Sequence, residues 1–394
     1  MNSLRVLLTN MWMAGRSGTE LYTADLARWL LRERHRPIVY SPYLGPLADA
    51  LIRESIPVVD RLDRISEAPD IVHGHHSLET VAALLWFHET PGIFVCHDCS
   101  AWHDRPPQMA RIYRYLAVDQ ACYDRLALRE GVCPESIRIV QNGVDPSRFR
   151  PRSPLPPRPR RALLISNYAD KQTARIVTQA CERSGINVDV AGARLQRSLE
   201  QPESHLPNYD LVFAKGRCAW EAMVVGAAVV ICDASTVGPL VSSDQFNELA
   251  SYNFGRRLLT QPLSADALAT QIARYNAGDA ELVSQLARQR SNLNHVANQL
   301  VDLYEQVIEQ HRLELQENCE PPSTHTCPAH SPYTSHPVTD RRMVESREAS
   351  QFLQWWSSQR DRLIEAQAAQ HLPHAALKRW WRSIRKRVGI GRAA

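Results

Sequence analysis

Short apolar runs that alternate with helix-forming segments restrict the fold of this 394-residue sequence more than any other feature. The runs are apolar throughout rather than at every second position, which is typical of strands that are buried on both faces of a parallel sheet. Between them, segments such as residues 20–34 repeat apolar residues with a helical period. The runs are RVLLTN, RPIVYS, IPVVD, DIVHG, GIFVCHD, YLAVD and IRIVQNG, followed by RALLISN, INVDVAG, YDLVFAK, AVVICD and RRLLT. The pattern predicts an α/β protein with two doubly wound domains.

A proline-rich segment marks the boundary between the two domains. Residues 151–160, PRSPLPPRPR, contain five prolines, which exclude a helix or a central strand and favour a stiff, extended hinge. After the last apolar run, residues 263–274 and 280–315 are predicted to be helical, and the following segment is rich in Pro, Ser, Thr and His. The predicted parts are residues 1–150 (first domain), 151–160 (hinge), 161–316 (second domain), 317–340 (linker) and 341–394 (helical extension).

The positive charge of the chain is concentrated at its end. The net charge is +4, but residues 366–394 carry seven Lys or Arg and no acid, so the remainder has 4 − 7 = −3. A mildly acidic body argues against a nucleic-acid-binding protein. Residues 374–394 place Trp380 and Trp381 on an apolar stripe flanked by cations, which favours a helix on an anionic membrane surface. The alternative is a solvated helix docked on an acidic partner.

The cysteines indicate reduced thiols and no metal site. There are nine of them without regular spacing, as expected in a cytoplasmic protein. Cys319, His325, Cys327 and His330 lie close together, but no paired CxxC motif accompanies them, so we expect no structural zinc. The first apolar run, RVLL, is too short for a signal peptide or a membrane span. The predicted location is the cytoplasm, with the basic extension as a possible peripheral contact to the inner membrane face.

A basic loop precedes a helix that contains a single acid. Lys215, Gly216 and Arg217 lie where the run YDLVF enters the next helix, which is where parallel α/β sheets bind ligands. The helix N-terminus and the two cations favour a phosphate. One turn further on, Glu221 can accept hydrogen bonds from the hydroxyls of a ribose. It can equally pair with Arg217 at i,i+4 as a structural ion pair.

Two further loops have the same character. The segment that follows AVVICD contains Thr236 and Gly238 and is predicted to be a second phosphate-binding loop. In the first domain, RVLLTN leads into a glycine-containing loop with Gly18, Thr19 and Glu20. One such loop is weak support for a ligand, whereas three that face one cleft predict a nucleotide site.

An ordered series of motifs resembles the family 4 glycosyltransferases of the GT-B fold. The motifs are Ile139-Val140-Gln141-Asn142-Gly143-Val144-Asp145 with Phe149 and Pro151, then Glu221-Ala222-Met223 with Gly226, the Gly18-Thr19-Glu20 loop, and His97-Asp98. The likeness covers about residues 4–315. It implies two Rossmann-like domains that face a cleft.

The resemblance also implies a function. It is the transfer of a sugar, with retention, from a UDP- or GDP-linked donor to a saccharide or lipid-linked acceptor, without metal or other cofactor. His97 and Lys215 are the expected catalytic residues. The expected donor-binding residues are Gly18, Thr19, Glu20, Asn167, Lys215, Gly216, Arg217, Glu221, Thr236 and Gly238. The acceptor side is expected to comprise His75, His76, Asp98, Trp102 and His103.

Two positions depart from the family pattern. Phe213 stands where the family usually has a second glutamate, and the loop at residues 166–171 lacks the usual arginine. These departures leave open a catalytically inactive scaffold that binds a nucleotide or saccharide. A nucleotide-sugar epimerase is a further alternative, but no obvious set of carboxylates is available for proton abstraction.

Overall fold

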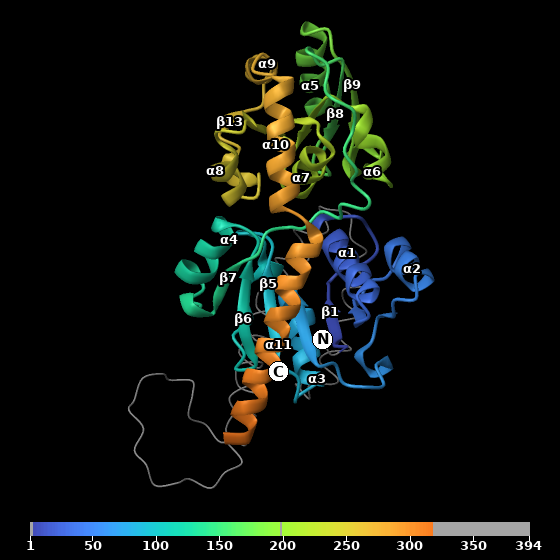
Figure 1. Ribbon diagram of the computed structural model, residues 1–394, viewed down its shortest axis with the longest axis vertical. Helices are drawn as coiled ribbons and strands as arrows, with labels where there is room; N and C mark the ends of the chain where they lie inside the picture. Colours follow the sequence, from blue (N-terminus) through green and yellow to red (C-terminus); the bar gives the residue numbers. More distant parts are fainter. Residues whose placement is uncertain (1–2, 198, 318–394) are drawn as a thin grey trace, which may run out of the picture.

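The computed structural model describes residues 3–197 and 199–317, which form two α/β domains stacked end to end (Figure 1). Each domain has its own central sheet and its own buried core. The predicted fold class, two Rossmann-like domains, is therefore confirmed. Apart from Glu317, the predicted linker and the helical extension lie outside the described residues.

The first sheet is parallel throughout, with strand order β3-β2-β1-β4-β5-β6-β7. Its strands are β1 (Arg5–Thr9), β2 (Arg36–Tyr40), β3 (Val58–Val59), β4 (Ile71–His75), β5 (Gly92–Cys96), β6 (Ile112–Ala117) and β7 (Ile137–Ile139). The helices that follow them are α1 (Gly18–Arg32), α2 (Pro46–Arg53), α3 (Ser77–Trp86) and α4 (Gln120–Asp124). Because β1, β4 and β5 are neighbours, the loops at their carboxyl ends lie side by side.

The second sheet has strand order β13-β12-β11-β10-β8-β9. Its strands are β8 (Arg161–Ile165), β9 (Asn187–Ala191), β10 (Leu211–Ala214), β11 (Ala228–Cys232), β12 (Thr236–Leu240) and β13 (Gln261–Pro262). Its helices are α5 (Lys171–Arg183), α6 (Pro202–His205), α7 (Gly216–Val225), α8 (Phe246–Ser251), α9 (Ala265–Ile272) and α10 (Ala277–Arg290). The loops after β8, β10 and β11 meet at one edge, which brings three of the predicted ligand segments together.

One predicted loop is a strand. The segment that contains Thr236 and Gly238 forms β12, which pairs antiparallel with β11. Val237 packs in the core, and a Cβ on Gly238 would come within 2.4 Å of the carbonyl oxygen of Leu258. The glycine therefore accommodates close backbone packing rather than forming part of a loop around a phosphate. Conversely, the predicted strand RRLLT forms a 3₁₀ helix, Arg256–Leu258, before β13.

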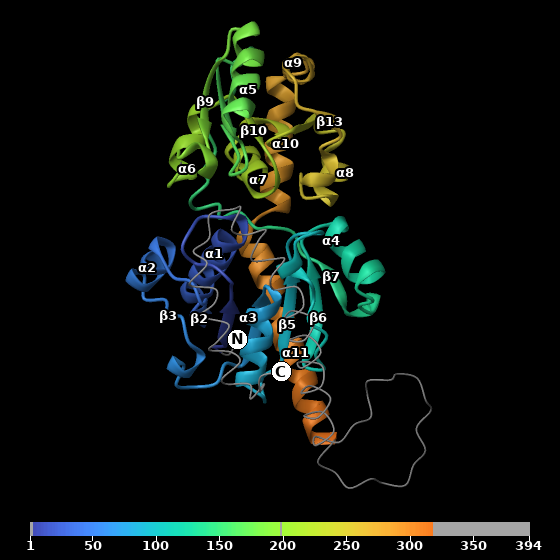
Figure 2. The same ribbon diagram turned by 180° about the vertical axis from the view of Figure 1, so that it is seen from behind.

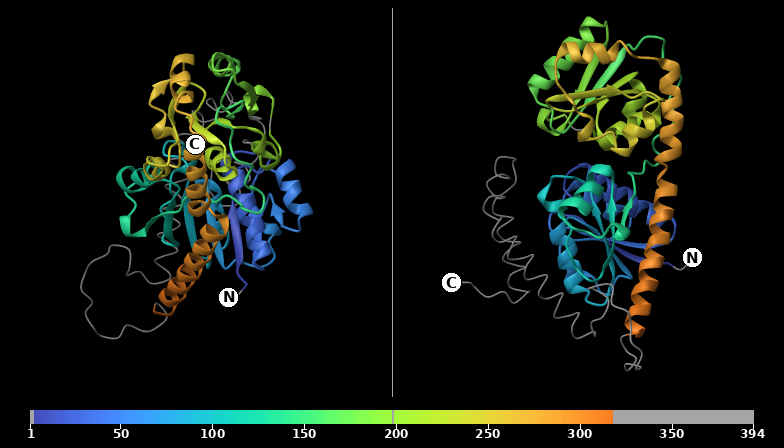
Figure 3. Two further views of the ribbon diagram at one scale, coloured as in Figure 1. Left: turned by 45° about the horizontal axis from the view of Figure 1, so that its top comes forward. Right: turned by 90° about the vertical axis from the view of Figure 1, so that its left-hand side faces the viewer.

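The chain returns to the first domain after α10. The single helix predicted over residues 280–315 is interrupted at Ser291, and α11 (Leu293–Glu317) covers the first sheet on the face opposite α3 (Figures 1 and 2). The last helix predicted for the domain over residues 161–316 therefore packs on the first domain instead. Figure 3 shows α11 along the whole length of that domain.

The two crossings between the domains pack against each other. The Val144 amide donates to the Ser291 carbonyl at 2.6 Å, and the Leu293 amide donates to the Val144 carbonyl at 3.0 Å. A Cβ on Gly143 would lie 2.9 Å from the Cα of Leu293. Close approach of these backbones is the physical reason for glycine in the Asn142-Gly143-Val144 motif.

Candidate active site

The site lies where loops of the first domain face the second domain. Arg256 donates to the Ser100 hydroxyl at 2.7 Å, and Arg257 donates to Asp124 at 2.7 Å. Ser100 follows β5, and Asp124 ends α4. These bonds hold the carboxyl edge of the first sheet against the second domain.

In the glycine-containing loop, a carboxylate of the protein already binds the backbone amides. The Glu20 carboxylate accepts from the Gly15 amide at 2.7 Å and from the Ser17 amide. Glu20 is 2 % exposed, and burial raises its pKa although both amides act in the opposite direction. Two N–H groups of this loop are therefore not free for a phosphate, and Glu20 organises the start of α1 as a capping residue does. Gly18 is exposed and Thr19 half-buried at the mouth of the loop.

Arg217 bridges the two domains through two buried carboxylates. Its Nε donates to Glu221 at 2.7 Å, and its Nη2 donates to Asp25 on α1. The Glu221 side chain is 2 % exposed, and burial together with Asp25 raises its pKa, against the effect of Arg217. The structural alternative for Glu221, an i,i+4 pair, is present in this structure. The donor-binding roles of Glu221 and Arg217 stay predictions that require this network to rearrange.

Arg148 extends the network. Its Nη1 donates to Asp25 at 2.7 Å, and its Nη2 donates to Glu203 at 2.9 Å. Asp25 is therefore paired with Arg217 from α7 and with Arg148 from the segment that crosses between the domains. The sequence interpretation missed Asp25. The signal that singled out Glu221, an acid within an apolar helix, was equally present in TADLARWLL.

Lys215 lies at the carboxyl edge of the second sheet with Asn167 and Gly216, two other members of the predicted donor site. Its Nζ contacts Asp233 at 2.5 Å and lies 5.0 Å from the centroid of the Tyr168 ring. Burial acts to raise the pKa of Asp233, but Lys215 and the Ser166 hydroxyl outweigh it, so the pKa is lowered. Asn167 is exposed in the same loop as Tyr168. The structure thus brings the ends of β8, β10 and β11 around one paired cation.

Gly216 begins α7 in a conformation that suits glycine. Its φ is +56°, and no atom lies within 4 Å of the position that a Cβ would take. The left-handed backbone, rather than lack of space, selects glycine at this helix start.

His97 joins a row of imidazoles at the carboxyl edge of the first sheet. Its Nε2 lies 2.8 Å from Nδ1 of His75, and Tyr22 packs edge-on against both rings. Burial lowers the pKa of His97 to about 3, and it lowers the pKa of His73 to about 3. The pKa of His75 is also well below its usual value, for the same reason. These rings are neutral at pH 7 and act as hydrogen-bonding groups.

His76, His103 and Asp104 form a second cluster on the acceptor side. Their possible ligand atoms lie within 4.8 Å of one another, which is suitable for a metal ion. However, the Met11 amide donates to Nδ1 of His76 at 2.9 Å, so the neutral ring carries its hydrogen on Nε2 and offers no lone pair there. Burial raises the pKa of Asp104 to about 8. The cluster is better described as a group of neutral polar side chains than as a metal site.

Asp98 and Trp102 lie beside this cluster. The Asp98 carboxylate accepts from the Ser100 amide at 2.6 Å and the Ala101 amide at 2.8 Å, so it orders the loop after β5. The Trp102 ring lies edge-on to His103 with centroids 5.4 Å apart. The acceptor-side roles of these residues stay predictions.

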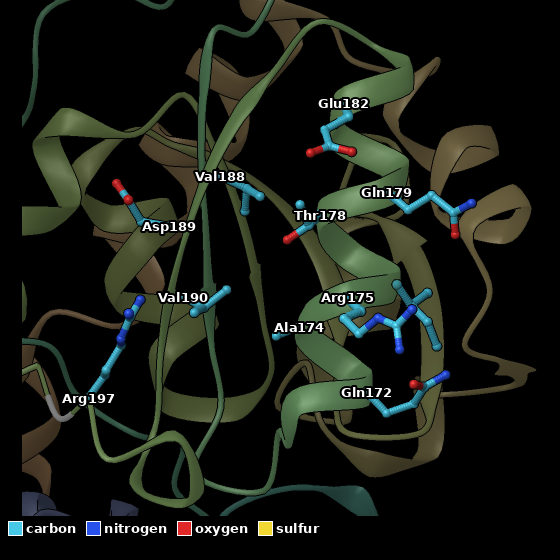
Figure 4. A pocket seen from close by; sticks show the side chains of 11 residues that line it. Gln172, Ala174, Arg175, Thr178, Gln179, Glu182, Val188, Asp189, Val190 and Arg197 are labelled. Carbon is cyan, nitrogen blue, oxygen red and sulfur yellow. The ribbon is translucent and has the colours of Figure 1, made fainter.

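A separate cavity lies away from these residues. It measures about 580 Å³, lies between α5 and the edge strand β9, and is lined by Arg175, Gln179 and Asp189 among others (Figure 4). None of the predicted site residues lines it. It is on the outer edge of the second sheet and not where parallel sheets usually bind ligands.

Comparison with known proteins supports the family. Residues 16–148 match the model of Glycosyltransferase Family 4. These residues lie in the first domain, which is therefore similar to family 4 glycosyltransferases. The matched segment includes the glycine-containing loop, the imidazole row and the Asn142-Gly143-Val144 motif. The resemblance inferred from the sequence is thereby confirmed.

Solved structures share the fold of this chain at low sequence identity. A glycosyltransferase from Rickettsia africae is 15 % identical, with a TM-score of 0.56 over 78 % of this chain and 99 % of the other. Anabaena Alr3699/HepE in complex with UDP and glucose is 16 % identical, with a TM-score of 0.58 over 77 % and 99 %. A putative UDP-N-acetylglucosamine 2-epimerase from Listeria monocytogenes is 14 % identical, with a TM-score of 0.50 over 78 % and 98 %. No curated protein matches the chain.

The membrane prediction concerns a part of the chain that is not described. Residues 374–394 lie outside the described ranges, as do Cys319, His325, Cys327 and His330. Within residues 3–197 and 199–317, no helix combines the length and apolar character needed to cross a bilayer.

Proposed function

We propose that the enzyme transfers a sugar, with retention, from a nucleotide-sugar to a saccharide or lipid-linked acceptor in glycan synthesis. The observation that carries the proposal is that predicted site residues lie at the carboxyl edges of both sheets, where the two domains meet. Lys215, Asn167 and Gly216 lie at the carboxyl edge of the second sheet, and His97 lies at the carboxyl edge of the first. Arg217 with Asp25 and Arg256 with Ser100 connect the two domains beside these edges. Structures of the fold neighbour HepE contain UDP and UDP-glucose, which supports a nucleotide-sugar as the donor.

In this proposal Lys215 neutralises the leaving diphosphate. In the unliganded protein its charge is compensated by Asp233 at 2.5 Å. A diphosphate carries more negative charge than one carboxylate and attracts the ammonium group more strongly, as leaving-group stabilisation requires. The helix start at Gly216 adds amide donors.

Glu221 is proposed to bind the ribose hydroxyls. Arg217 covers this carboxylate, so donor binding has to move the guanidinium from Glu221 towards the phosphates or towards Asp25. Movement of Arg217 would then both free Glu221 for the ribose and bring a cation to the phosphates, which are the two roles predicted for this segment. His97 lies next to the transferred sugar as a neutral hydrogen-bonding group.

The acceptor is proposed to bind beside His76, Trp102 and His103. A lipid-linked acceptor would be approached from a membrane surface held by residues 374–394. Removal of the residues after Gln370 is expected to lower binding to anionic liposomes and to leave donor binding unchanged. Liposome binding that survives the truncation would contradict the membrane contact.

Release of nucleoside diphosphate tests the proposed reaction. A panel of UDP-, GDP- and ADP-sugars is compared by thermal shift on the wild type and on Glu221→Ala, and diphosphate release is then measured with the stabilising donor and candidate saccharide acceptors. A transferase stabilised by one donor releases diphosphate only with acceptor. Interconversion of the donor without release identifies an epimerase. Stabilisation with neither reaction identifies the inactive scaffold that the buried Phe213 leaves open.

A further inference from the structure

A row of side chains, joined by two hydrogen bonds and one ring contact, connects α11 with His97. Tyr304 on α11 lies 2.5 Å, through its hydroxyl, from Nδ1 of His73 on β4. The rings of His73 and His75 follow with centroids 4.6 Å apart, and Nδ1 of His75 lies 2.8 Å from Nε2 of His97. Tyr304, His73 and His75 are all fully buried. The row ends at the site, where Nδ1 of His97 has no hydrogen-bond partner among the described residues.

Each histidine in the row carries one hydrogen on its ring. Burial keeps all three imidazoles neutral at pH 7. A neutral imidazole has one nitrogen that donates and one that accepts. The position of the hydrogen on His75 therefore restricts its position on His97, to which His75 is hydrogen-bonded.

The hydroxyl of Tyr304 sets the direction of the row. Among the described residues its partner is Nδ1 of His73. A phenol O–H is a stronger donor than an imidazole N–H, and an imidazole nitrogen is a stronger acceptor than a phenol oxygen, so Tyr304 donates and Nδ1 of His73 accepts. His73 then carries its hydrogen on Nε2.

His75 transmits this direction to His97. The Nε2 atoms of His73 and His75 are both buried and, within residues 3–197 and 199–317, without a hydrogen-bond partner. If both Nε2 atoms carried a hydrogen, two buried N–H donors on adjacent rings would lack an acceptor. If His75 carries its hydrogen on Nδ1 instead, only the Nε2–H of His73 lacks an acceptor. With its hydrogen on Nδ1, His75 donates to Nε2 of His97, and His97 must carry its own hydrogen on Nδ1.

We propose that Tyr304, His73 and His75 are positioning residues that fix the tautomer of His97, so that His97 presents an Nδ1–H donor to the oxygen atoms of the bound sugar. The inference rests on the proposed function only for the identity of that ligand. The tautomer itself is a property of the unliganded protein. Because α11 supplies the first donor of the row, the last described helix of the chain contributes to a site at the carboxyl edge of the first sheet.

The test is the tautomer of His97 measured by ¹⁵N–¹H NMR on protein with ¹⁵N-labelled histidine. His97→Gln identifies the signals of His97 by their loss. We expect a protonated Nδ1 and an unprotonated Nε2 in the wild type. In Tyr304→Phe the constraint is lost, and we expect a mixture of both tautomers. Tyr115→Phe is the matched control, because it removes a buried hydroxyl that donates to the Pro107 carbonyl, away from the row.

The outcomes are decisive without any assay of activity. His97 with its hydrogen on Nε2 in the wild type overturns the proposal, and an unchanged Nδ1–H tautomer in Tyr304→Phe overturns the role of Tyr304. With an active donor, we expect kcat to fall ~5-fold in Tyr304→Phe at unchanged donor KM, about the value of one hydrogen bond. Tyr115→Phe is expected to keep the wild-type kcat. If no nucleotide-sugar reacts, the proposed function fails while the tautomer measurement still stands.

Discussion

At the scale of single residues, charged groups between the domains are held in pairs. Arg217 lies between Asp25 and Glu221, and its side chain is 7 % exposed. Removal of one member of a buried charge network leaves the others uncompensated, which costs far more than the loss of a surface pair. This network therefore dominates the electrostatic contribution of the domain interface to stability.

We predict that Arg217→Ala lowers the free energy of unfolding by ~3–5 kcal/mol, because the buried Glu221 loses its ion-pair partner and Asp25 loses one of its arginines. The matched control is Arg183→Ala, which breaks a solvent-exposed pair with Asp266 and should cost ~0–1 kcal/mol. Urea denaturation measures both variants. Equal losses would show that Arg217 is not held as the structure places it.

Residues differ in how far the sequence revealed them. Lys215 and His97 were predictable, because each directly follows an apolar run that could only be a buried strand. The partners of Arg217 were not, because Asp25 is 192 positions away and only the relative placement of the domains brings the two together. Thr236 was assigned to a loop because the antiparallel return of β12 has no signal in a sequence that otherwise alternates strand and helix.

At the scale of elements, the ends of β4 and β5 concentrate buried titratable groups of both kinds. Five histidines have lowered pKa values, and two carboxyls have pKa values raised to about 8. They are His73, His75, His76, His97 and His103, with Glu79 and Asp104. The two kinds of group bind protons differently in the folded and unfolded chain, and their effects on stability have opposite signs.

We predict that stability is greatest near about pH 6.5. Below this pH the unfolded chain protonates histidines that the fold keeps neutral, so stability falls as the pH decreases towards about 4. Above it the fold still holds protons on Glu79 and Asp104 that the unfolded chain has released, so stability falls as the pH rises towards 8. Urea denaturation at pH 5, 6.5 and 8 measures the curve. Stability that does not change between pH 5 and 6.5 would show that these histidines are not buried as described.

The two crossings between the domains provide a second test at this scale. Gly143→Ala is expected to lower the free energy of unfolding by ~1–3 kcal/mol, because its Cβ would approach the Leu293 backbone to 2.9 Å. Gly278→Ala in the first turn of α10 meets only an ordinary contact at 3.5 Å and should be neutral or stabilising. Thermal and urea unfolding measure both. A neutral Gly143→Ala would mean that the crossings are not packed against each other.

At the scale of the whole molecule, the two domains are connected by the crossings at Val144 and Ser291, and α11 packs on the first domain. The proline-rich segment at residues 151–160 packs on the second domain rather than between the domains. The order of apolar runs and the hinge predicted both domains. The return of α11 was not predicted, because its apolar stripe has no feature that distinguishes one sheet from the other. Only the break at Ser291 and its pairing with Val144 direct the helix to the first domain.

The central claim is that the carboxyl edge of the second sheet, rather than the cavity beside α5, binds the donor through Lys215. Calorimetric titration of UDP and GDP into the wild type, Lys215→Ala and Arg175→Ala tests it most directly. Arg175 lines the cavity of Figure 4 and serves as the matched control. We predict ~10–100-fold weaker binding in Lys215→Ala, the value of a charge-assisted hydrogen bond, and wild-type affinity in Arg175→Ala. Unchanged affinity in Lys215→Ala, or a loss confined to Arg175→Ala, would contradict the claim.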